Sequence, residues 1–365
     1  MEIEFQNFKR LYLNLKKELD EAYYETMLSG YYILGKHLCK FESAFSEYCK
    51  SEYTVGVASG LDALTIALSS LHLKKGSEVI VPANTYIATF ISIVKAGLVP
   101  VPVDADIKTL QINTDLIKEK ITQKTAVILP VHLYYQTADM DIINEIAVNN
   151  NLQIVTDAAQ GHGTRYKGRI VGSLAEIECF SFYPTKNLGA IGDAGAIVTN
   201  NNEVNLNSRI LRNYGEKERY ISELIGYNSR MDELQAAFLN VKLRHLDAWN
   251  ERRRYIAKRY ISEINSNYIK LPEVSEFSTP NWYIFPIISK KRGCIKQALE
   301  RKGIKTIVHY PVPPYLQPAF RYLGFSEKSF PISYYIANTE LSLPIDPYLE
   351  ESEIDFIIDS INNLK

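Results

Sequence analysis

Apolar residues recur in two alternating patterns along the first two thirds of the chain. Short apolar runs typical of buried strands are separated by stretches whose apolar positions are spaced as on one face of a helix. The strand-like runs are residues 53–58, 78–82, 99–103, 126–132, 152–156, 177–182 and 196–199, and the helical stretches between them include 62–71, 86–96 and 139–149. This alternation predicts βαβ units and a mostly parallel sheet, which places ligand loops at the carboxyl ends of its strands.

The pattern differs at the two ends of the chain. Helices are predicted over 1–29 and 37–49, with a loop at 30–35 between them. Residues 201–207 are polar, and 231–264 read as one long helix in which Arg252–Arg254 form a solvated basic face. Short strands and helices follow at 281–288, 295–302 and 306–310, before a last helix at 351–363. We therefore predict a large α/β domain at 1–245 and a smaller α+β domain at 246–365.

Composition narrows the class of protein. A chain of 365 residues exceeds one ordinary core, and 46% hydrophobic with 23% charged residues is usual for a soluble globular protein. A net charge of -1 gives no sign of a nucleic-acid or membrane-surface partner. The four cysteines form no CxxC pair, so neither a disulfide framework nor a metal site is predicted. Charges near the N-terminus argue against a signal peptide, and prolines interrupt the longest apolar region, so we expect a cytoplasmic protein without a membrane span.

One lysine stands out chemically. The strand-like run 177–182 breaks at Pro184, and Lys186 follows before the next run at 196–199. Between two buried strands, an ammonium group costs several kcal/mol to desolvate unless it is neutral, paired or covalently used. Burial also lowers the pKa of an amine and so favours the neutral form that attacks a carbonyl. The alternative is an ordinary solvated loop lysine.

Other polar residues stand at the ends of the predicted strands. Asp157 ends the run 152–156, and it either caps a helix or keeps a pyridinium nitrogen protonated. The turn Ser59–Asp62 offers backbone N–H groups and a helix N-terminus to a phosphate, to which Ser181 could also donate. Tyr86 either packs in the core or stacks on an aromatic ring. The chain contains no G-x-G-x-x-G sequence, so no dinucleotide site is predicted.

A phosphate cradle, an aromatic residue, an aspartate, a serine and a lysine, in that order, resemble the fold type I aminotransferases that use pyridoxal 5'-phosphate. More narrowly, the chain resembles the DegT/DnrJ/EryC1/StrS family of nucleotide-sugar aminotransferases. The segments that carry this resemblance are 30–35 (GYYILG), 59–64 (SGLDAL), 82–89 (PANTYIAT), 157–160 (DAAQ), 181–188 (SFYPTKNL), 192–195 (GDAG) and 226–232 (GYNSRMD).

The resemblance implies a role for each matching residue. Lys186 would bond to the cofactor and move the proton, and a lysine rather than a histidine at this position favours transamination over dehydration. Asp157 would pair with the pyridinium nitrogen, Gln160 would lie near the ring hydroxyl and Tyr86 would stack on the ring. The phosphate contacts would come from Gly60, Leu61, Ser181 and, across a homodimer with shared active sites, Asn228 of the neighbouring subunit.

Two residues depart from the family pattern. Leu61 stands where the family often has threonine or serine, which puts one side-chain contact to the phosphate in doubt. Tyr135 stands where relatives usually carry glycine, and we expect it to narrow the site or to alter sugar selection.

The resemblance also suggests a substrate. Residues 306–320 resemble the loop of family members that aminate carbon three of dTDP-linked 3-oxo-6-deoxyhexoses, with glutamate as the usual amino donor. His309, Tyr310 and Tyr183 would face the sugar, although each could instead pack in the core. Lys217 and Arg219 would bind the diphosphate, or be plain surface charges. The alternatives are amination at carbon four and a non-catalytic regulatory homologue.

Overall fold

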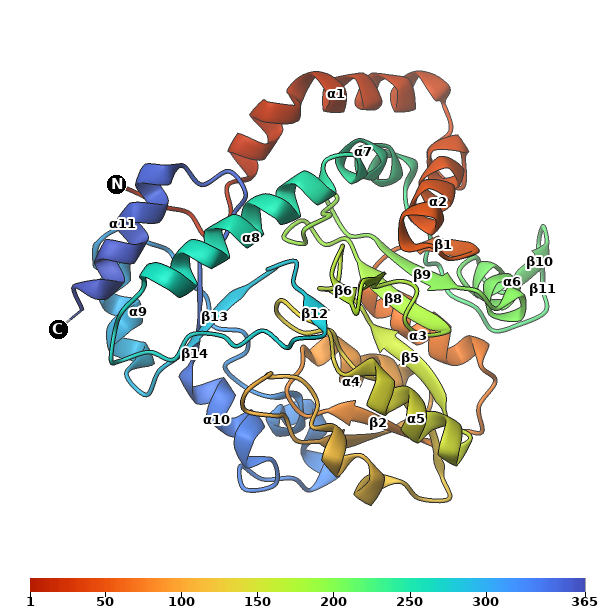
Figure 1. Ribbon diagram of the computed structural model, residues 1–365. Helices are drawn as coiled ribbons and strands as arrows, with labels where there is room; N and C mark the ends of the chain where they lie inside the picture. The colour runs from red at the N-terminus through yellow and green to blue at the C-terminus, as the bar shows by residue number, and fades with distance from the viewer. Residues whose placement is uncertain (365) are drawn as a thin grey trace.

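The computed structural model describes residues 1–364, so Lys365, the last residue of the predicted small domain, lies outside the described residues. A seven-stranded sheet in the order β1-β9-β8-β5-β4-β2-β3 forms its centre (Figure 1). The strands are β1 (Tyr53–Val57), β2 (Glu78–Pro82), β3 (Val99–Val103), β4 (Thr125–Ile128), β5 (Gln153–Asp157), β8 (Ile177–Ser181) and β9 (Gly195–Thr199). Neighbouring strands from β8 to β3 are parallel, while β9 is antiparallel to both β1 and β8. The predicted mostly parallel sheet is therefore confirmed.

Helices cover both faces of this sheet. One face carries α3 (Gly60–Ser70), α4 (Ile87–Lys95) and α6 (Asn202–Leu211), and the other carries α2 (Lys36–Cys49), α5 (Met140–Asn150) and α7 (Glu233–Leu243). The alternation of side chains along β8 explains this arrangement, because Ile177 and Cys179 join the core on the α3 face while Phe180 joins the core under α2. The long helix α1 (Phe8–Ser29) packs against α7 (Figure 1).

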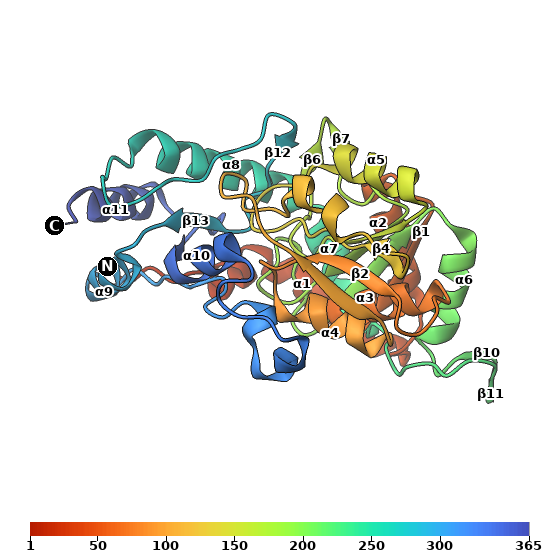
Figure 2. The ribbon, with the colours of Figure 1, turned by 90° about the horizontal axis from the view of Figure 1, so that it is seen from below.

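The C-terminal part extends the core of the α3 face rather than forming a separate one. It contains α8 (Leu246–Glu263), β13 (Phe285–Ile288), α9 (Arg292–Arg301), η3 (Pro314–Leu316), η4 (Pro318–Leu323), α10 (Pro331–Thr339), β14 (Glu340–Leu343) and α11 (Glu351–Asn362). The strands β13 and β14 pair antiparallel. Ile3 pairs with Ile304, and both chain termini lie on this side of the molecule (Figures 1 and 2). The boundary between residues 245 and 246 stays a prediction.

Two smaller sheets lie outside the central one. The hairpin of β10 (Glu216–Glu218) and β11 (Ile221–Ser222) projects from the edge of the molecule (Figure 2). A three-stranded sheet joins β12 (Ser278–Thr279), β6 (Arg165–Tyr166) and β7 (Arg169–Ile170). Short 3-10 helices η1 (Thr114–Leu116) and η2 (Lys118–Lys120) precede β4. Within residues 1–364, no helix is both long enough and apolar enough to cross a membrane.

Several predicted elements are wrong in detail. The predicted helix over 231–264 is two helices, because the backbone tightens into i→i-3 hydrogen bonds at Arg244 and His245 before α8 begins. The polar stretch 201–207, for which the sequence predicted no helix or strand, opens α6, whose N-cap is the side chain of Asn201. Residues 306–310 do not form a strand, and only Ile307 forms a bridge to Ser342.

The basic run Arg252–Arg254 is only partly the solvated face that the sequence suggested. Arg252 pairs with Glu351 and Arg254 pairs with Glu251, each at 2.7 Å. Arg253, by contrast, is buried, and its burial lowers its pKa to about 10. The basic run therefore lies at the edge of the core, where Arg252 and Arg254 are partly exposed and Arg253 is buried.

Candidate active site

A cavity of about 630 Å³ opens at the edge of the sheet where the parallel strands end. Strands β1, β5 and β8 point to this edge, so the residues that follow them meet there. Ten of the predicted site residues line the cavity: Gly60, Leu61, Tyr86, Asp157, Gln160, Ser181, Tyr183, Lys186, His309 and Tyr310. Residues more than 200 positions apart in the sequence thus share one site.

Asp157 is a buried carboxyl group without a cationic partner among residues 1–364. Its side chain accepts hydrogen bonds from Thr89 Oγ1 at 2.9 Å and from the Ala159 N–H at 3.1 Å. Burial raises its pKa, and the nearby charge of Lys186 acts in the opposite direction. No lysine, arginine or histidine of residues 1–364 forms an ion pair with it. A protonated pyridine nitrogen would supply the missing positive charge.

The turn before α3 has the form of an anion cradle. Ser59 caps the helix by accepting from the Asp62 N–H at 3.1 Å, which leaves the N–H groups of Gly60 and Leu61 at the open helix end. A Cβ atom on Gly60 would lie 2.5 Å from Ser181 Cβ, so only glycine allows the helix to start this close to the end of β8. The donor set and the close approach of Ser181 fit a phosphate group.

The sequence predicts that Lys186 is buried between two strands, but the structure places it elsewhere. It follows β8 in the loop to β9, is half-buried, and places Nζ 4.5 Å from the centre of the Tyr283 ring. The strands pair only as far as Ser181 and Gly195, so the loop beyond them opens over the sheet edge into the cavity. Lys242 Nζ anchors this loop through a 2.6 Å hydrogen bond to the Gly189 carbonyl.

Aromatic side chains also line the cavity. Tyr86 is 52% exposed, so it is not a core residue, and its ring centre lies 5.1 Å from that of Tyr310. Gln160 Nε2 donates to Tyr310 Oη at 3.1 Å, which links the two predicted ligand regions. Tyr183 is similarly exposed and lines the same space.

His309 lines the cavity, and its backbone and its ring form hydrogen bonds with Tyr134, Glu340 and Ser342. Its N–H donates to Glu340 Oε2 at 2.6 Å, its carbonyl accepts from Tyr134 Oη at 2.6 Å, and its Nδ1 lies 2.8 Å from Ser342 Oγ. Burial, with a smaller contribution from the charge of Lys186, lowers its pKa to about 3. The imidazole is therefore neutral at ordinary pH.

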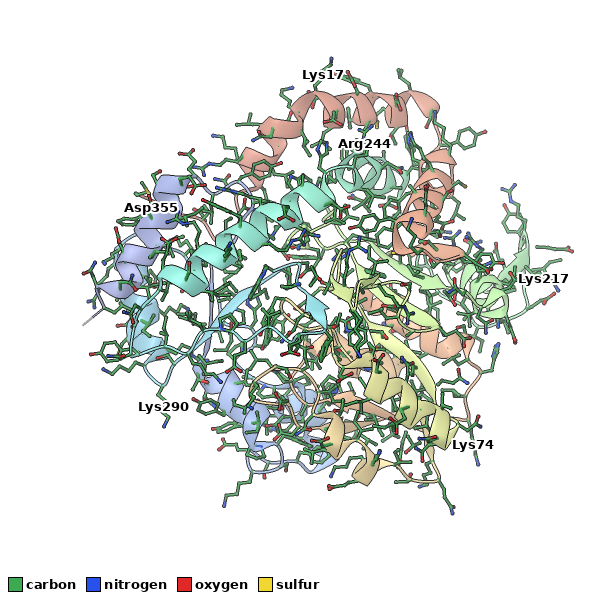
Figure 3. All side chains as sticks on the ribbon, viewed as in Figure 1. Lys17, Lys74, Lys217, Arg244, Lys290 and Asp355 are labelled. Carbon is green, nitrogen blue, oxygen red and sulfur yellow. The ribbon has the colours of Figure 1, made fainter. Side chains whose placement is uncertain are left out.

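Three predicted site residues do not reach this cavity. Lys217 extends from the hairpin at the edge of the molecule, where it pairs with Glu223 at 3.5 Å (Figure 3). Arg219 lies over the Tyr220 ring, 4.9 Å from its centre, and Asn228 is exposed beside Asn213. None of the three is among the residues that line the cavity of their own chain.

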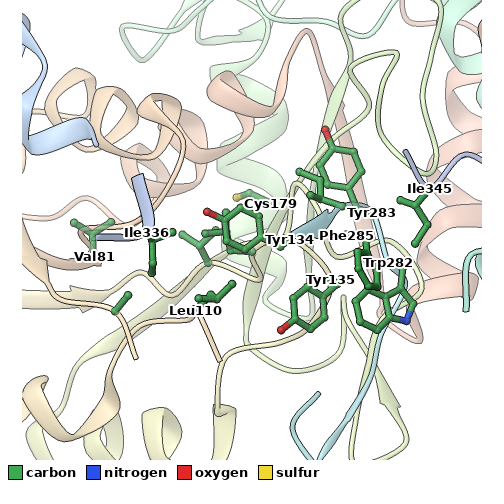
Figure 4. Packing of buried hydrophobic residues seen from close by; sticks show 14 of the residues in the cluster. Val81, Leu110, Tyr134, Tyr135, Cys179, Trp282, Tyr283, Phe285, Ile336 and Ile345 are labelled. Atoms are coloured by element: carbon green, nitrogen blue, oxygen red, sulfur yellow. The ribbon is translucent and has the colours of Figure 1, made fainter. Parts of the chain in front are cut away.

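Tyr135 does not narrow the site, contrary to the expectation from sequence. Its side chain is buried in the core, where its ring stacks on Trp282 with centres 4.5 Å apart (Figure 4). Its hydroxyl donates to the Glu273 carbonyl at 2.9 Å. Tyr135 therefore packs against the C-terminal part of the chain and does not line the cavity.

Sequence reasoning missed three residues that shape the site. Thr89, which donates a hydrogen bond to Asp157, lies in segment 82–89, one of the segments that resemble the family. The sequence therefore pointed to this segment, but it did not show that Thr89 contacts Asp157. Tyr283 and Thr185 line the cavity and share a 3.1 Å hydrogen bond between their hydroxyl groups. Tyr283 comes from a stretch that reads as an ordinary apolar strand, and it carried no local signal.

The sequence of this chain matches a known protein family and several characterised enzymes. Residues 14–362 match the model of the DegT/DnrJ/EryC1/StrS aminotransferase family. The dTDP-3-amino-3,4,6-trideoxy-alpha-D-glucose transaminase of Streptomyces venezuelae is 43% identical over 87% of this chain and 84% of its own length. The dTDP-3-amino-3,6-dideoxy-alpha-D-galactopyranose transaminase of Aneurinibacillus thermoaerophilus is 43% identical over 91% of both chains.

A solved structure has nearly the same fold. The crystal structure of S. venezuelae DesV in complex with a ketimine intermediate superposes with a TM-score of 0.97 at 42% identity, covering 99% of this chain and 98% of that one. Another relative, 42% identical over 91% of both chains, is the erythromycin biosynthesis sensory transduction protein EryC1 of Saccharopolyspora erythraea.

Proposed function

Because the chain belongs to the DegT/DnrJ/EryC1/StrS aminotransferase family and is a pyridoxal 5'-phosphate-dependent sugar-nucleotide aminotransferase, we propose its specific reaction. It transfers the amino group of glutamate to carbon three of a dTDP-linked 3-keto-6-deoxyhexose, giving a dTDP-3-amino-3,6-dideoxyhexose and 2-oxoglutarate. One observation carries the proposal: Lys186, Asp157 and the cradle share a single cavity with His309 and Tyr310. Two relatives whose names specify dTDP-3-amino sugars support the position of the amine.

The proposed cofactor residues follow from the polar groups of the cavity. The N–H groups of Gly60 and Leu61, with the Ser181 hydroxyl, hold the phosphate, so the leucine side chain costs one contact but no backbone donor. Asp157 meets the pyridinium nitrogen, Gln160 lies at the ring hydroxyl and Tyr86 covers the ring face. When bound, pyridoxal 5'-phosphate would supply an electron-withdrawing ring and an aldehyde carbon that carries the amino group between the two substrates.

Lys186 is the proposed proton carrier. Among residues 1–364, it is the only lysine or arginine that lines the cavity. Its Nζ accepts the proton that leaves the α-carbon of glutamate and later donates a proton to the carbon that receives the amine. Its place in a half-buried loop, rather than in the sheet, gives Nζ the freedom to reach both positions.

The sugar nucleotide requires residues beyond this cavity. Tyr183, His309 and Tyr310 face the proposed sugar position, whereas neither Lys217 nor Arg219 lines the cavity of its own chain. We assign Lys217, Arg219 and Asn228 to the active site of a second copy, where the two cations bind the diphosphate.

An exposed apolar segment supports this homodimer. Tyr31, Tyr32, Ile33 and Leu34 follow α1 and are all exposed. Ile33 forms a bridge to Asp232, so the segment lies beside the loop that carries Asn228. Exposed apolar residues gathered in this way are typical of a protein interface.

The position of the amine can be tested directly. Purified protein loaded with pyridoxal 5'-phosphate is incubated with glutamate and a mixture of dTDP-3-keto- and dTDP-4-keto-6-deoxyhexoses, and the products are examined by NMR. We expect the amine on carbon three. An amine on carbon four would refute the proposed substrate while keeping the family's chemistry.

A non-catalytic regulatory role is the second candidate, because two relatives carry regulatory names. In that case, glutamate would not convert the bound cofactor to its amine form. The absorbance of the cofactor during a single half-reaction therefore separates the two candidates.

A further inference from the structure

Behind His309, a serine and a buried carboxyl group form a hydrogen-bonded chain that leads away from the cavity. We propose that Glu340 and Ser342 are positioning residues whose shared proton decides whether His309 Nε2 donates or accepts a hydrogen bond in the cavity. The part of this inference that concerns the sugar rests on the function proposed above.

The chain is continuous from the core to the cavity. Glu340 Oε1 and Ser342 Oγ are 2.5 Å apart, and Ser342 Oγ lies 2.8 Å from His309 Nδ1. The other carboxyl oxygen, Oε2, accepts a hydrogen bond from the backbone N–H of His309 at 2.6 Å. Glu340 therefore holds the backbone of His309 as well as contacting its ring through Ser342. The second ring nitrogen, Nε2, has no hydrogen-bond partner among residues 1–364, and His309 lines the cavity.

The two protonation states of Glu340 orient this chain oppositely. When Glu340 is ionised, Ser342 donates its proton to Oε1 and accepts one from His309 Nδ1–H, so Nε2 is left as an acceptor. When Glu340 is protonated, it donates to Ser342 Oγ, and Ser342 then donates to His309 Nδ1, so Nε2 carries the proton. The imidazole remains neutral in both states, and only its tautomer changes.

The surroundings of Glu340 favour the protonated state near neutral pH. Its side chain is fully buried at the start of β14, and burial raises its pKa to about 8. The hydrogen bonds from Ser342 and from the His309 N–H act against this shift, and so, to a smaller extent, does the guanidinium of Arg292 from α9. Tyr134 faces the same carboxyl, while Lys186 and Tyr310 face the imidazole from the cavity side.

A donor at Nε2 suits the substrate of the amination step. The carbonyl oxygen of a keto-sugar can only accept a hydrogen bond, so Nε2–H binds it and an unprotonated Nε2 does not. Glu340 thereby couples keto-sugar binding to pH from a position that touches neither sugar nor cofactor.

The tautomer can be read without turnover. In the cofactor-loaded protein labelled with [15N]histidine, the signal of His309, one of six histidines, is assigned by its loss in His309→Asn. We expect the proton on Nε2 well below the pKa of Glu340 and on Nδ1 well above it. In Glu340→Gln the side-chain amide replaces the protonated acid, so Nε2 should keep its proton throughout. A wild-type tautomer that does not change with pH, or that changes identically in Glu340→Gln, would overturn the proposal.

Ser342→Ala provides a second, smaller change, which keeps Glu340 but cuts the chain. Its His309 tautomer should no longer follow the titration of Glu340, and a retained pH response would also overturn the proposal. In steady-state assays, the KM of the wild type for the keto-sugar should rise about tenfold as Glu340 ionises, while that of Glu340→Gln stays flat. If the tautomer switches but no keto-sugar is aminated, the proposed function fails and the switch stands.

Discussion

The two walls of the cavity are built in different ways. The cofactor wall, which we define as Gly60, Asp157, Ser181 and Lys186, comes from the carboxyl ends of β1, β5 and β8 in one sheet. The substrate wall, defined as Tyr283, His309 and Tyr310, comes from the C-terminal part, and Glu340 and Ser342 support it from behind.

This difference separates chemistry from selectivity. Apart from Lys186 on its loop, the residues of the cofactor wall are held at strand ends of the sheet, so their positions cannot vary without disturbing the core. The substrate wall rests on loops, a short two-stranded sheet and, in our proposal, a hairpin of the second subunit. Changes in the first wall should therefore reduce the rate with every substrate, while changes in the second should act mainly on binding of the sugar nucleotide.

The largest effect is expected at Lys186. Lys186→Ala removes the proposed proton carrier, so the half-reaction with glutamate should slow by at least about 10³-fold. Stopped-flow absorbance of the cofactor measures this rate. Lys242→Met, which alters the anchor of the same loop without touching the cavity, is the matched control and should retain far more activity. Unchanged turnover in Lys186→Ala would remove the residue from the mechanism.

The next largest effect is expected at Asp157. Asp157→Asn keeps the shape of the side chain but loses its charge, so both half-reactions should slow by about 10²-fold. The same variant should slow catalysis equally with every keto-sugar tested, because the cofactor wall does not read the sugar. Thr89→Val, which removes one hydrogen bond to Asp157, should have a much smaller effect in the same assay. A loss confined to one sugar would contradict the division of the two walls.

A smaller effect is expected on the outlying hairpin. Arg219→Ala and Lys217→Ala should each raise the KM for the sugar nucleotide about tenfold, with little change in the glutamate half-reaction. Added salt should weaken wild-type binding and narrow the gap to the variants. Glu218→Ala, on the same hairpin, serves as the control because it removes no cation.

Mixed dimers test where those cations act. If active sites are shared, co-expressed Lys186→Ala and Arg219→Ala subunits should recover up to about a quarter of the wild-type kcat/KM, because half the dimers are mixed and each contains one intact site. If both residues served the same chain, no site with the wild-type KM would form, and only the weak kcat/KM of the Arg219→Ala subunits would remain.

A separate effect is expected on stability rather than on activity. Glu178 is fully buried, and burial raises its pKa from 4.5 to about 7. Between these values the folded state holds a proton that the unfolded state releases, so stability should fall as pH rises through this window, by an amount on the order of 3 kcal/mol. Glu178→Gln should flatten that fall in urea unfolding at constant protein concentration. An identical pH slope in both proteins would contradict the assigned burial.

The sequence predicted every residue of the cofactor wall, whereas it missed Tyr283 in the substrate wall. Asp157, Ser181 and Lys186 stand at strand ends that apolar periodicity reveals, and parallel strands must bring those ends together. Lys186 still came out more exposed than expected, because strand pairing stops before the loop that carries it.

The misses share a physical cause. Tyr283 and Glu340 acquire their roles through contacts with residues far away in the sequence, which no local pattern encodes. Tyr135 shows the reverse error. The sequence suggested a role in the site because this position departs from the family pattern, but the side chain stacks on Trp282 in the core. The break before α8 depends on packing of both helices, so a continuous helical period concealed it.

Borohydride reduction of the cofactor-loaded protein, followed by peptide mapping, tests whether Lys186 is the residue that bonds to the cofactor. We expect a single pyridoxyl group, on the peptide that contains Lys186. Attachment to another lysine, or no attachment at all, would contradict it.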